Sequence, residues 1–327
     1  MVNVFITGIT GFIGPFIAKK FIHEGYNVYG LIRHSPYRNL DALTPILKKL
    51  HLIEGDIRDF HSVNSAIRAS KPDIVIHAAA LTPVRLSFVD PFQYIHVNYE
   101  GTANVVHAII ENTPKARMIL ASTGEVYGFN PNKKAIKEDA QLNPTMPYAV
   151  SKMAADHYVQ MAMKLYDLKA TILRFFNTYG RREKGFFTEY VIAAMLNGET
   201  VYVGLPNATR DYMYIDDHIQ AYTLAIENES SIGEVYNVSA GNPNSNREYV
   251  KTISELVGFK GKIVYGEYPP GYPPRPAIMD PIYIVGDSNK IREKLGWKPS
   301  VTLNEGLKKT INMFIKAKQY PNLKWIW

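Results

Sequence analysis

The first 24 residues contain the pattern that most restricts the fold, an apolar run that stops at a glycine-rich turn and continues into an amphipathic segment. Residues 2–7 predict a buried strand, and the helical spacing of apolar residues as far as Glu24 predicts a helix. Gly8, Gly11 and Gly14 give the turn between them the spacing G-x-x-G-x-x-G. Glycines let the chain turn tightly, let a pyrophosphate approach the main chain, and let the helix pack on the strand. The pattern predicts a dinucleotide site at a helix N-terminus, with ordinary turn chemistry as the alternative.

Strand and helix patterns alternate beyond this turn as far as about residue 180. The further strands are expected at residues 27–33, 51–56, 73–77, 117–121 and 170–175, and the helices at 60–70, 91–112 and 148–166. Such alternation is typical of an α/β fold with a doubly wound parallel sheet. We therefore expect residues 1–180 to form a Rossmann-type dinucleotide-binding domain. Residues 181–327 are expected to form mainly a smaller substrate-binding α/β region, with some segments returning to the first sheet.

The strand expected at residues 27–33 is where the adenosine ribose of a dinucleotide would lie. A site that prefers NAD usually places a carboxylate near the end of this strand. No acidic residue occurs between Glu24 and Asp41, and the strand ends at Arg33, whose charge suits the 2′-phosphate of NADP. We expect tightly bound NADP or NAD, with NADP favoured; the alternative is that Arg33 only covers the adenine.

Several short motifs fall at the carboxyl ends of the expected strands, where ligands lie in sheets of this kind. His77 also lies at a strand end, but three alanines follow it, so we expect a packed side chain and no base or metal ligand. The cofactor-binding residues expected from these segments, besides Arg33, are Gly8, Thr10, Gly11, Phe12, Ile13, Gly14, Asp56, Ile57, Ala78 and Ala79.

A tyrosine and a lysine, Tyr148 and Lys152, are spaced to share one face of the helix that begins near Pro147. A phenol titrates near 10, and an adjacent ammonium group stabilises its anion, so the pair suggests an acid/base working near neutral pH. The spacing alone is weak, because chance supplies it often. Upstream, Thr123 and Glu125 lie in a hydroxyl-rich loop after the fifth strand and add candidate catalytic groups.

Composition excludes several other classes of protein. The 327 residues include no cysteine, which rules out disulfides, thiol nucleophiles and thiolate metal sites, and we expect no metal. The net charge of +7 comes from scattered Lys and Arg residues, which argues against a nucleic-acid stripe and fits an enzyme of anionic small molecules. No apolar run approaches the roughly 18 residues of a membrane span, and no signal-peptide pattern occurs, so we expect a cytoplasmic protein.

Several motifs occur in a characteristic order along nearly the whole chain. They are residues 7–14, 55–59, 77–80 and 97–102, Ser122-Thr123, Tyr148-x-x-x-Lys152, residues 210–212, and the later segments 286–290 and 295–299. Together they resemble the extended short-chain dehydrogenase/reductase family and, within it, the nucleotide-sugar epimerases and dehydratases.

The resemblance implies a role for each matched residue. Tyr148 would remove a proton from the sugar O4 as a hydride leaves C4 for the nicotinamide. Lys152 would lower the pKa of Tyr148 and bind the nicotinamide ribose, and Thr123 would hydrogen-bond the same sugar oxygen. The implied partners are a nucleotide-diphosphate sugar and a second copy of the chain, paired through helices 91–112 and 148–166. The implied substrate-binding residues are Ser87, Asn98, Asn177, Arg210 and Arg275, of which the arginines would contact the diphosphate and nucleotide.

The overall reaction is decided by the step after oxidation at C4. Dehydratases of this family place a Glu two residues after the catalytic Ser or Thr, and Glu125 matches that position. The 4-keto group acidifies the C5 proton, which such a carboxylate can remove while water leaves C6. Gly124 departs from the pattern, because dehydratases of dTDP-glucose have Asp there and those of GDP-mannose have Ser.

The sequence therefore favours a nucleotide-sugar 4,6-dehydratase of the GDP-mannose type, which is a lyase. A UDP-sugar 4-epimerase, an isomerase, is the main alternative, with Glu125 as a solvated loop residue. A GDP-4-keto-6-deoxyhexose reductase and a non-catalytic dinucleotide-binding sensor are less favoured, the latter because both Tyr148 and Lys152 are present.

Overall fold

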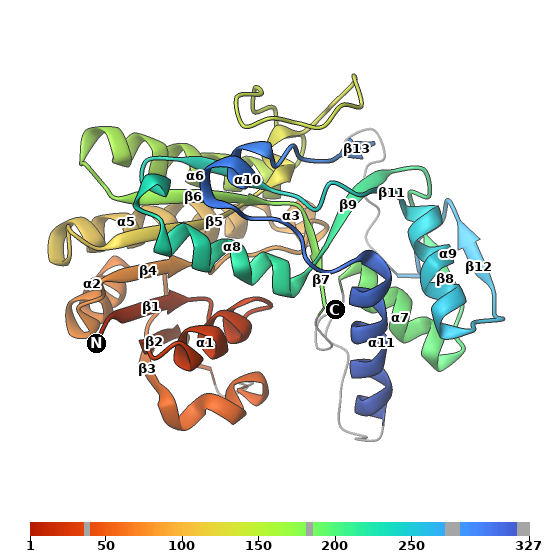
Figure 1. Ribbon diagram of the computed structural model, residues 1–327, viewed down its shortest axis with the longest axis horizontal. Helices are drawn as coiled ribbons and strands as arrows, with labels where there is room; N and C mark the ends of the chain where they lie inside the picture. Colours follow the sequence, from red (N-terminus) through yellow and green to blue (C-terminus); the bar gives the residue numbers. More distant parts are fainter. Residues whose placement is uncertain (36–39, 181–185, 272–281, 319–327) are drawn as a thin grey trace.

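A seven-stranded parallel sheet forms the centre of the structure, a computed structural model that describes residues 1–35, 40–180, 186–271 and 282–318 (Figure 1). The strand order is β10-β6-β5-β4-β1-β2-β3. The strands are β1 Asn3–Thr7, β2 Asn27–Ile32, β3 Leu50–Glu54, β4 Ile74–His77, β5 Arg117–Thr123, β6 Ala170–Phe175 and β10 Val235–Val238. The expected doubly wound α/β architecture is confirmed.

Helices cover both faces of this sheet because its strands are apolar on both sides. In β1, Val4 and Ile6 pack into one hydrophobic cluster, whereas Phe5 packs into a second cluster on the opposite face. The first face is covered by α1 Gly14–His23, the 3₁₀ helix η1 Asp41–Lys49 and α8 Ile215–Glu227. The second face is covered by α2 Phe60–Ser70, α5 Gly101–Asn112 and α6 Pro147–Leu165.

The helix expected at residues 91–112 is divided into three parts. A short helix, α4 Pro91–Tyr94, leads into a π-helical segment, Ile95–Glu100, before α5 begins. The wider turn contains Asn98, whose side chain is buried and bonded to a neighbouring loop. Such π-helical turns often occur at functional sites.

A smaller region begins where β6 ends. The strand β7 Asn177–Tyr179 follows β6 after one residue and pairs with β9 Thr209–Tyr214, the centre of a second sheet. This region includes α7, α9 and α11, at the right of Figure 1. Besides β7 and β9, the elements of this region are α7 Phe187–Asn197, β8 Val201–Val203, β11 Pro243–Ser245, α9 Asn246–Val257, β12 Ile263–Tyr265, β13 Tyr283–Ile284 and α11 Leu303–Lys318. Between β13 and α11, the helix α10 Asn289–Leu295 returns to pack on β10 of the main sheet.

The order of strands places a ligand site at one edge of the main sheet. β1 lies between β2 and β4, so the connections that leave these strands diverge at the carboxyl end of β1. Such a switch point is where open α/β sheets bind ligands. The glycine turn, the loop after β4 and the end of β5 meet there, beside the smaller region.

Candidate active site

The glycine turn is shaped by contacts that leave no room for side chains. Gly8 has φ of +74°, and a β-carbon on it would lie 2.7 Å from the main-chain nitrogen of Ala79. A β-carbon on Gly14 would lie 2.3 Å from the carbonyl oxygen of Gly8. The amide of Gly11 closes the turn by donating to the same oxygen at 2.8 Å. The loop after β1 therefore packs directly on the loop after β4, with Ala78 and Ala79 beneath the turn.

The N-terminus of α1 faces this turn without a capping side chain in the described structure. Its N-cap residue is Ile13, Pro15 stands in its first turn, and that turn contains no acidic residue. The first amides of a helix carry partial positive charge and bind phosphate groups. The glycine cradle and the uncapped helix therefore fit the pyrophosphate of a dinucleotide, as the sequence predicts. Thr10 and Phe12 complete the turn.

Charged side chains lie at the ends of β2 and β3, where the adenosine half of such a cofactor would bind. Arg33 is exposed just after β2, and its charge helps to lower the pKa of Asp56. The main cause of that lowering is Arg58, whose Nη2 lies 2.7 Å from Oδ2 of Asp56. Glu54, a residue that the sequence alone did not single out, lies opposite Ile32 at the end of β3. A carboxylate therefore stands near this edge, although β2 itself carries none.

His77 is a packed neutral side chain, as expected. Its Nδ1 lies 2.7 Å from the Thr7 hydroxyl, and its Nε2 lies 2.9 Å from the Thr102 hydroxyl. Burial lowers the pKa of His77 to about 3, and the positive charge of Lys152 acts in the same direction. Ile57, also expected to bind the cofactor, is buried against Gly101 at the start of α5.

The four predicted catalytic residues lie together. Thr123 is the last residue of β5, Glu125 lies in the short 3₁₀ turn that follows it, and Tyr148 is in the first turn of α6. The Tyr148 phenol is hydrogen-bonded to the Thr123 hydroxyl, and the negative charge of Glu125 acts on it. These two groups converge on the phenol, as required for residues that contact one substrate.

Burial raises the pKa of Tyr148 well above its ordinary value; the Thr123 hydrogen bond lowers it, and the charges of Glu125 and Tyr94 raise it further. This differs from the expectation that Lys152 lowers the pKa of the phenol towards neutrality, because burial outweighs that effect. The ammonium group instead donates to the carbonyl oxygen of Ala121 at 2.6 Å. Burial lowers the pKa of Lys152 to about 8, against the opposing effect of Asp156.

Asn98 ties the loop after β4 to the catalytic helix. Its Oδ1 accepts from the amide of Leu81 at 2.7 Å, and its Nδ2 donates to the Leu81 carbonyl at 3.0 Å and to the Ser151 hydroxyl at 2.9 Å. The Ser151 hydroxyl donates in turn to the carbonyl of Tyr148 at 2.7 Å. This predicted substrate residue thus holds the first turn of α6 in place.

The other predicted substrate residues, as far as the structure describes them, lie on separate elements. Ser87, in the short helix α3 Leu86–Val89, is buried and donates to the Val84 carbonyl at 2.5 Å. Asn177 is half-buried in β7. Arg210 is buried in β9 and donates from Nη1 to the Thr209 carbonyl at 3.0 Å. Arg275 lies outside the described residues.

A buried ion pair behind the catalytic residues was missed in the sequence. Asp156 and Arg174 join α6 to β6 through a contact of 2.9 Å between Oδ1 and Nη2. Asp156 lies four residues after Lys152, so the helical spacing that identified Lys152 also places this carboxylate on the same face. That spacing was the available signal.

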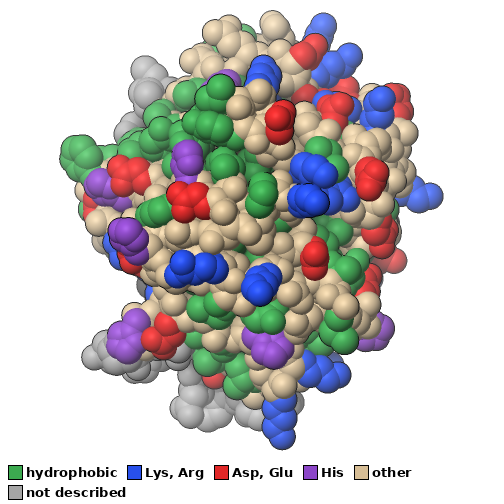
Figure 2. Space-filling model, turned by 90° about the vertical axis from the view of Figure 1, so that its left-hand side faces the viewer, with side chains coloured by type: hydrophobic (Ala, Val, Ile, Leu, Met, Phe, Trp, Pro, Cys, Tyr) green, Lys and Arg blue, Asp and Glu red, His purple; other side chains and the backbone are tan. Residues whose placement is uncertain are grey.

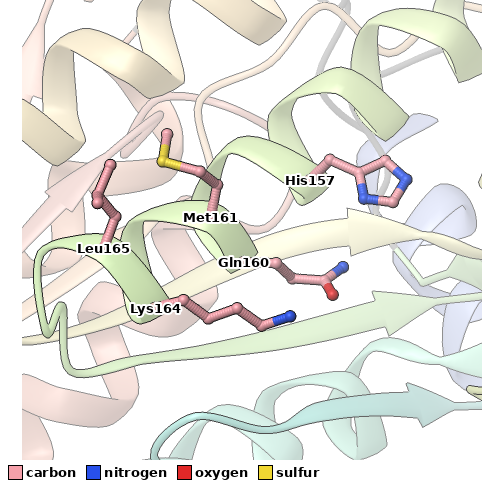
Figure 3. Close-up of a pocket in the computed structure, with 5 residues that line it drawn as sticks. All are labelled: His157, Gln160, Met161, Lys164 and Leu165. Carbon is pink, nitrogen blue, oxygen red and sulfur yellow. The ribbon is translucent and has the colours of Figure 1, made fainter.

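The outer surface of α6 lies away from the Thr123, Glu125 and Tyr148 side chains. A shallow depression of about 450 Å³ is lined by five residues of α6, among them Met161 and Leu165 (Figure 3). In the described part of the chain, no three His, Asp or Glu side chains are arranged to hold a metal ion. No described helix is both long and apolar enough to cross a bilayer.

Comparisons with known proteins agree with this geometry. Residues 5–310 match the family model described as GDP-mannose 4,6-dehydratase. The UDP-glucose 4-epimerase of Mycolicibacterium smegmatis is 32% identical over 96% of this chain and 99% of its own length. The dTDP-D-glucose 4,6-dehydratase of Mus musculus is 31% identical over 98% of this chain and 90% of its own.

A solved structure extends the match to three dimensions. The UDP-glucose 4-epimerase of Thermus thermophilus, solved as a complex with NAD, is 30% identical and superposes with a TM-score of 0.84, covering 97% of this chain and 100% of that one. The similarity to this epimerase thus extends over almost the full length of the chain. The range matched by the family model includes the glycine turn, the uncapped helix α1 and the group of Thr123, Tyr148 and Lys152. The chain belongs to the extended short-chain dehydrogenase/reductase family of NAD-dependent nucleotide-sugar epimerases and dehydratases.

Proposed function

We propose that the chain catalyses the 4,6-dehydration of a nucleotide-diphosphate sugar, which makes it a lyase. The observation that carries this proposal is the position of Glu125. Its Oε2 atom is buried and makes no hydrogen bond within the described structure, and its charge acts on the Tyr148 phenol. A carboxylate without a structural partner thus stands beside the sugar's acid/base, whereas epimerisation at C4 requires no such group.

The residues divide the proton transfers between them. NAD(P), held at the turn of Gly8, Gly11 and Gly14, would supply the acceptor for the C4 hydride and the source of hydride for C6. Tyr148, beside Thr123, would take the O4 proton, and Lys152, one helical turn further along α6, would bind the nicotinamide ribose. Glu125 would then take the C5 proton, which the 4-keto group has acidified, and pass it to the C6 hydroxyl, which leaves as water. C5 would regain a proton from Tyr148, which holds the one taken from O4, as the hydride arrives at C6.

The substrate, the diphosphate contact and the cofactor are assigned from the family model and from individual residues. GDP-mannose is the first candidate substrate, because the matching family model carries that description. Arg210 is the described arginine proposed to contact the diphosphate. We propose NADP as the preferred cofactor because of Arg33, although Glu54 nearby would repel a 2′-phosphate.

A UDP-sugar 4-epimerase is the second candidate, and Gly124 favours it. The residue between Thr123 and Glu125 has no side chain, so it supplies no additional acid to protonate the leaving hydroxyl at C6. A relative named UDP-glucose 4-epimerase is as similar to this chain as one named dTDP-glucose 4,6-dehydratase.

A panel of GDP-mannose, dTDP-glucose, UDP-glucose and UDP-N-acetylglucosamine separates the two candidates. The purified protein is incubated with each sugar, and the masses of the products are measured by mass spectrometry. Dehydration requires a product lighter by one water, with the alkaline absorbance of a 4-keto-6-deoxy sugar. A product of unchanged mass and altered configuration would establish the epimerase instead.

We also propose a homodimer formed through α5 and α6. The outer face of α6 exposes Val150 by 40% and Leu165 by 65%, and it contains the depression in Figure 3. Figure 2, which faces the left-hand side of Figure 1, shows hydrophobic side chains gathered at its upper left. Light scattering should give twice the 37.0 kDa mass of the chain, and Leu165→Glu should reduce it to one chain. A wild-type mass of one chain would remove the proposal.

A further inference from the structure

The buried pair Asp156 and Arg174 is fully hydrogen-bonded behind the catalytic residues. Arg174 contacts both carboxylate oxygens, with Nη2 at 2.9 Å from Oδ1 and Nε at 3.0 Å from Oδ2. Ser122 donates to Oδ2 at 2.6 Å and Gln160 donates to Oδ1 at 2.7 Å. The side chains are 0% and 3% exposed, so water does not compete for these bonds.

The partners of this pair lie on both sides of two catalytic residues. Ser122 immediately precedes Thr123, and Tyr127 follows Glu125 by two residues. Asp156 accepts from the Ser122 hydroxyl, and Arg174 donates from Nη1 to the Tyr127 hydroxyl at 2.8 Å. Residues 122–127 are therefore held at both ends by one ion pair, whose acidic member lies on the helix of Tyr148 and Lys152.

Stability alone does not explain the charges at this position. Moving two ions out of water costs about as much as their attraction returns, and apolar pairs of similar volume often stabilise a protein more. Burial alone would raise the pKa of Asp156, but the hydrogen bonds and charge of Arg174 hold it below its ordinary value. The pair is ionised at neutral pH, with its negative member one helical turn from Lys152.

The titratable and charged groups around Lys152 and Tyr148 come from several elements. His77 from β4 is neutral above about pH 3 and contributes no positive charge in the working range. Asp156 raises the pKa of Lys152, in opposition to burial. The groups facing this pair or the ion pair behind it are His77 from β4, Tyr94 from α4, Glu125 and Tyr127 from the turn after β5, Glu138 from the following loop, Asp156 from α6 and Arg174 from β6.

We propose that Asp156 and Arg174 are positioning residues for the reaction. They fix the segment that carries Thr123 and Glu125 against the helix that carries Tyr148 and Lys152, and they present a paired negative charge to the Lys152 ammonium group. The inference rests on the proposed function for its role in turnover, but the placement of charge can be measured without any sugar.

The effect of the ion pair's charges on Lys152 is tested with the variants Asp156→Asn and Arg174→Met. Asp217→Asn is the control. Asp217 is another buried carboxylate, in α8, and it caps the chain at Ser300 and Val301. Lys152 is labelled competitively with acetic anhydride across a pH series, and its peptide is quantified by mass spectrometry. Wild type should give a midpoint near 8, from the Lys152 pKa of about 8.

The two variants should move this midpoint in opposite directions. Asp156→Asn leaves an unpaired positive charge and should lower it by about one pH unit, and Arg174→Met leaves a negative charge and should raise it by about as much. Asp217→Asn should not move it. Shifts of the same sign, or no shift, in the folded variants would overturn the proposal, because the charges of the pair would then not act on Lys152.

Positioning is tested with Ser122→Ala, which removes one bond to Asp156 and leaves the ion pair intact. The turnover number on whichever sugar the substrate panel identifies should fall about tenfold, with the Lys152 midpoint and the KM unchanged. Unchanged turnover would overturn the positioning role.

If a charge variant does not fold, Ser122→Ala and the double variant Asp156→Asn/Arg174→Met decide. The double variant should keep the wild-type midpoint of Lys152 labelling and lose turnover. If no sugar is converted, the proposed function fails while the labelling result still stands.

Discussion

The ring of Phe176 occupies the space that a side chain on Gly124 would need. An ideal β-carbon on Gly124 would lie 2.6 Å from Cε1 of that ring, closer than real β-carbons approach other atoms. The same ring covers Gly286, so it is enclosed from two sides. The absence of a side chain between Thr123 and Glu125 is therefore imposed by packing.

Gly124→Ala should destabilise the protein by about 2 kcal/mol, because overpacking of a filled core costs about 1–3 kcal/mol. The cost should shrink in a Phe176→Leu background, which removes part of the ring. Chemical denaturation of the four proteins in this cycle gives the coupling energy, expected at about 1 kcal/mol. Additive effects would show that the ring moves freely out of the way.

Two buried histidines should make the fold sensitive to mild acid. Burial lowers the pKa of His77 to about 3 and that of His218 well below its ordinary value. Below the unfolded pKa of about 6.5, the unfolded chain binds protons that the native state excludes. The contribution of each histidine to the free energy of unfolding is therefore fully present above about pH 6.5. It should fall by about 1.4 kcal/mol per pH unit as the pH drops below that value.

Denaturant titrations between neutral pH and about pH 5 measure this slope. His77→Gln, which keeps a donor and an acceptor for Thr7 and Thr102, should reduce it by one histidine's contribution. A slope unchanged in this variant would mean that His77 is protonated in the folded state.

The local features of the fold were predictable, because they depend on residues close in the sequence. The glycine turn, the alternation of strands and helices, and the shared helix face of Tyr148 and Lys152 follow from spacing, whereas the role of Thr123 came from the family resemblance. The π-helical segment was not, since Asn98 is bonded to Leu81 and Ser151, far along the chain. A regular helical pattern gives no sign of such distant partners.

The second sheet could not be predicted for a similar reason. β9 pairs with β7, β11 and β13, which are short and come from segments separated by tens of residues. In such strands, periodicity is too brief to identify, and the partner is chosen by tertiary packing. The effect of burial on Tyr148 was likewise hidden, because the sequence shows the neighbouring cation but does not show how deeply the phenol lies.

Arg33→Ala should weaken NADP binding about tenfold and leave NAD binding within about twofold, since only NADP has a phosphate to lose its partner. Glu54→Gln should strengthen NADP binding, because it removes a negative charge near the 2′-phosphate. Binding is measured by calorimetry with each dinucleotide. Arg68→Ala, an exposed arginine near the far end of α2, is the matched control. Wild-type protein that binds NAD ten times more tightly than NADP would reverse the proposed preference.

Glu125→Gln separates dehydration from the oxidation that precedes it. Glutamine has the same shape but cannot take the C5 proton, so formation of the 4-keto-6-deoxy product should fall by about a thousandfold. Oxidation at C4 depends on Tyr148 and Thr123, so the absorbance of reduced nicotinamide should still appear in a single turnover. Tyr148→Phe should abolish both signals, and Glu111→Gln, a carboxylate on the outer part of α5 that contacts Asn64, should change neither. Dehydration that persists in Glu125→Gln would assign the C5 proton to another group. Conversion to an isomer of unchanged mass, equally fast in wild type and Glu125→Gln, would identify an epimerase in which this carboxylate has no part.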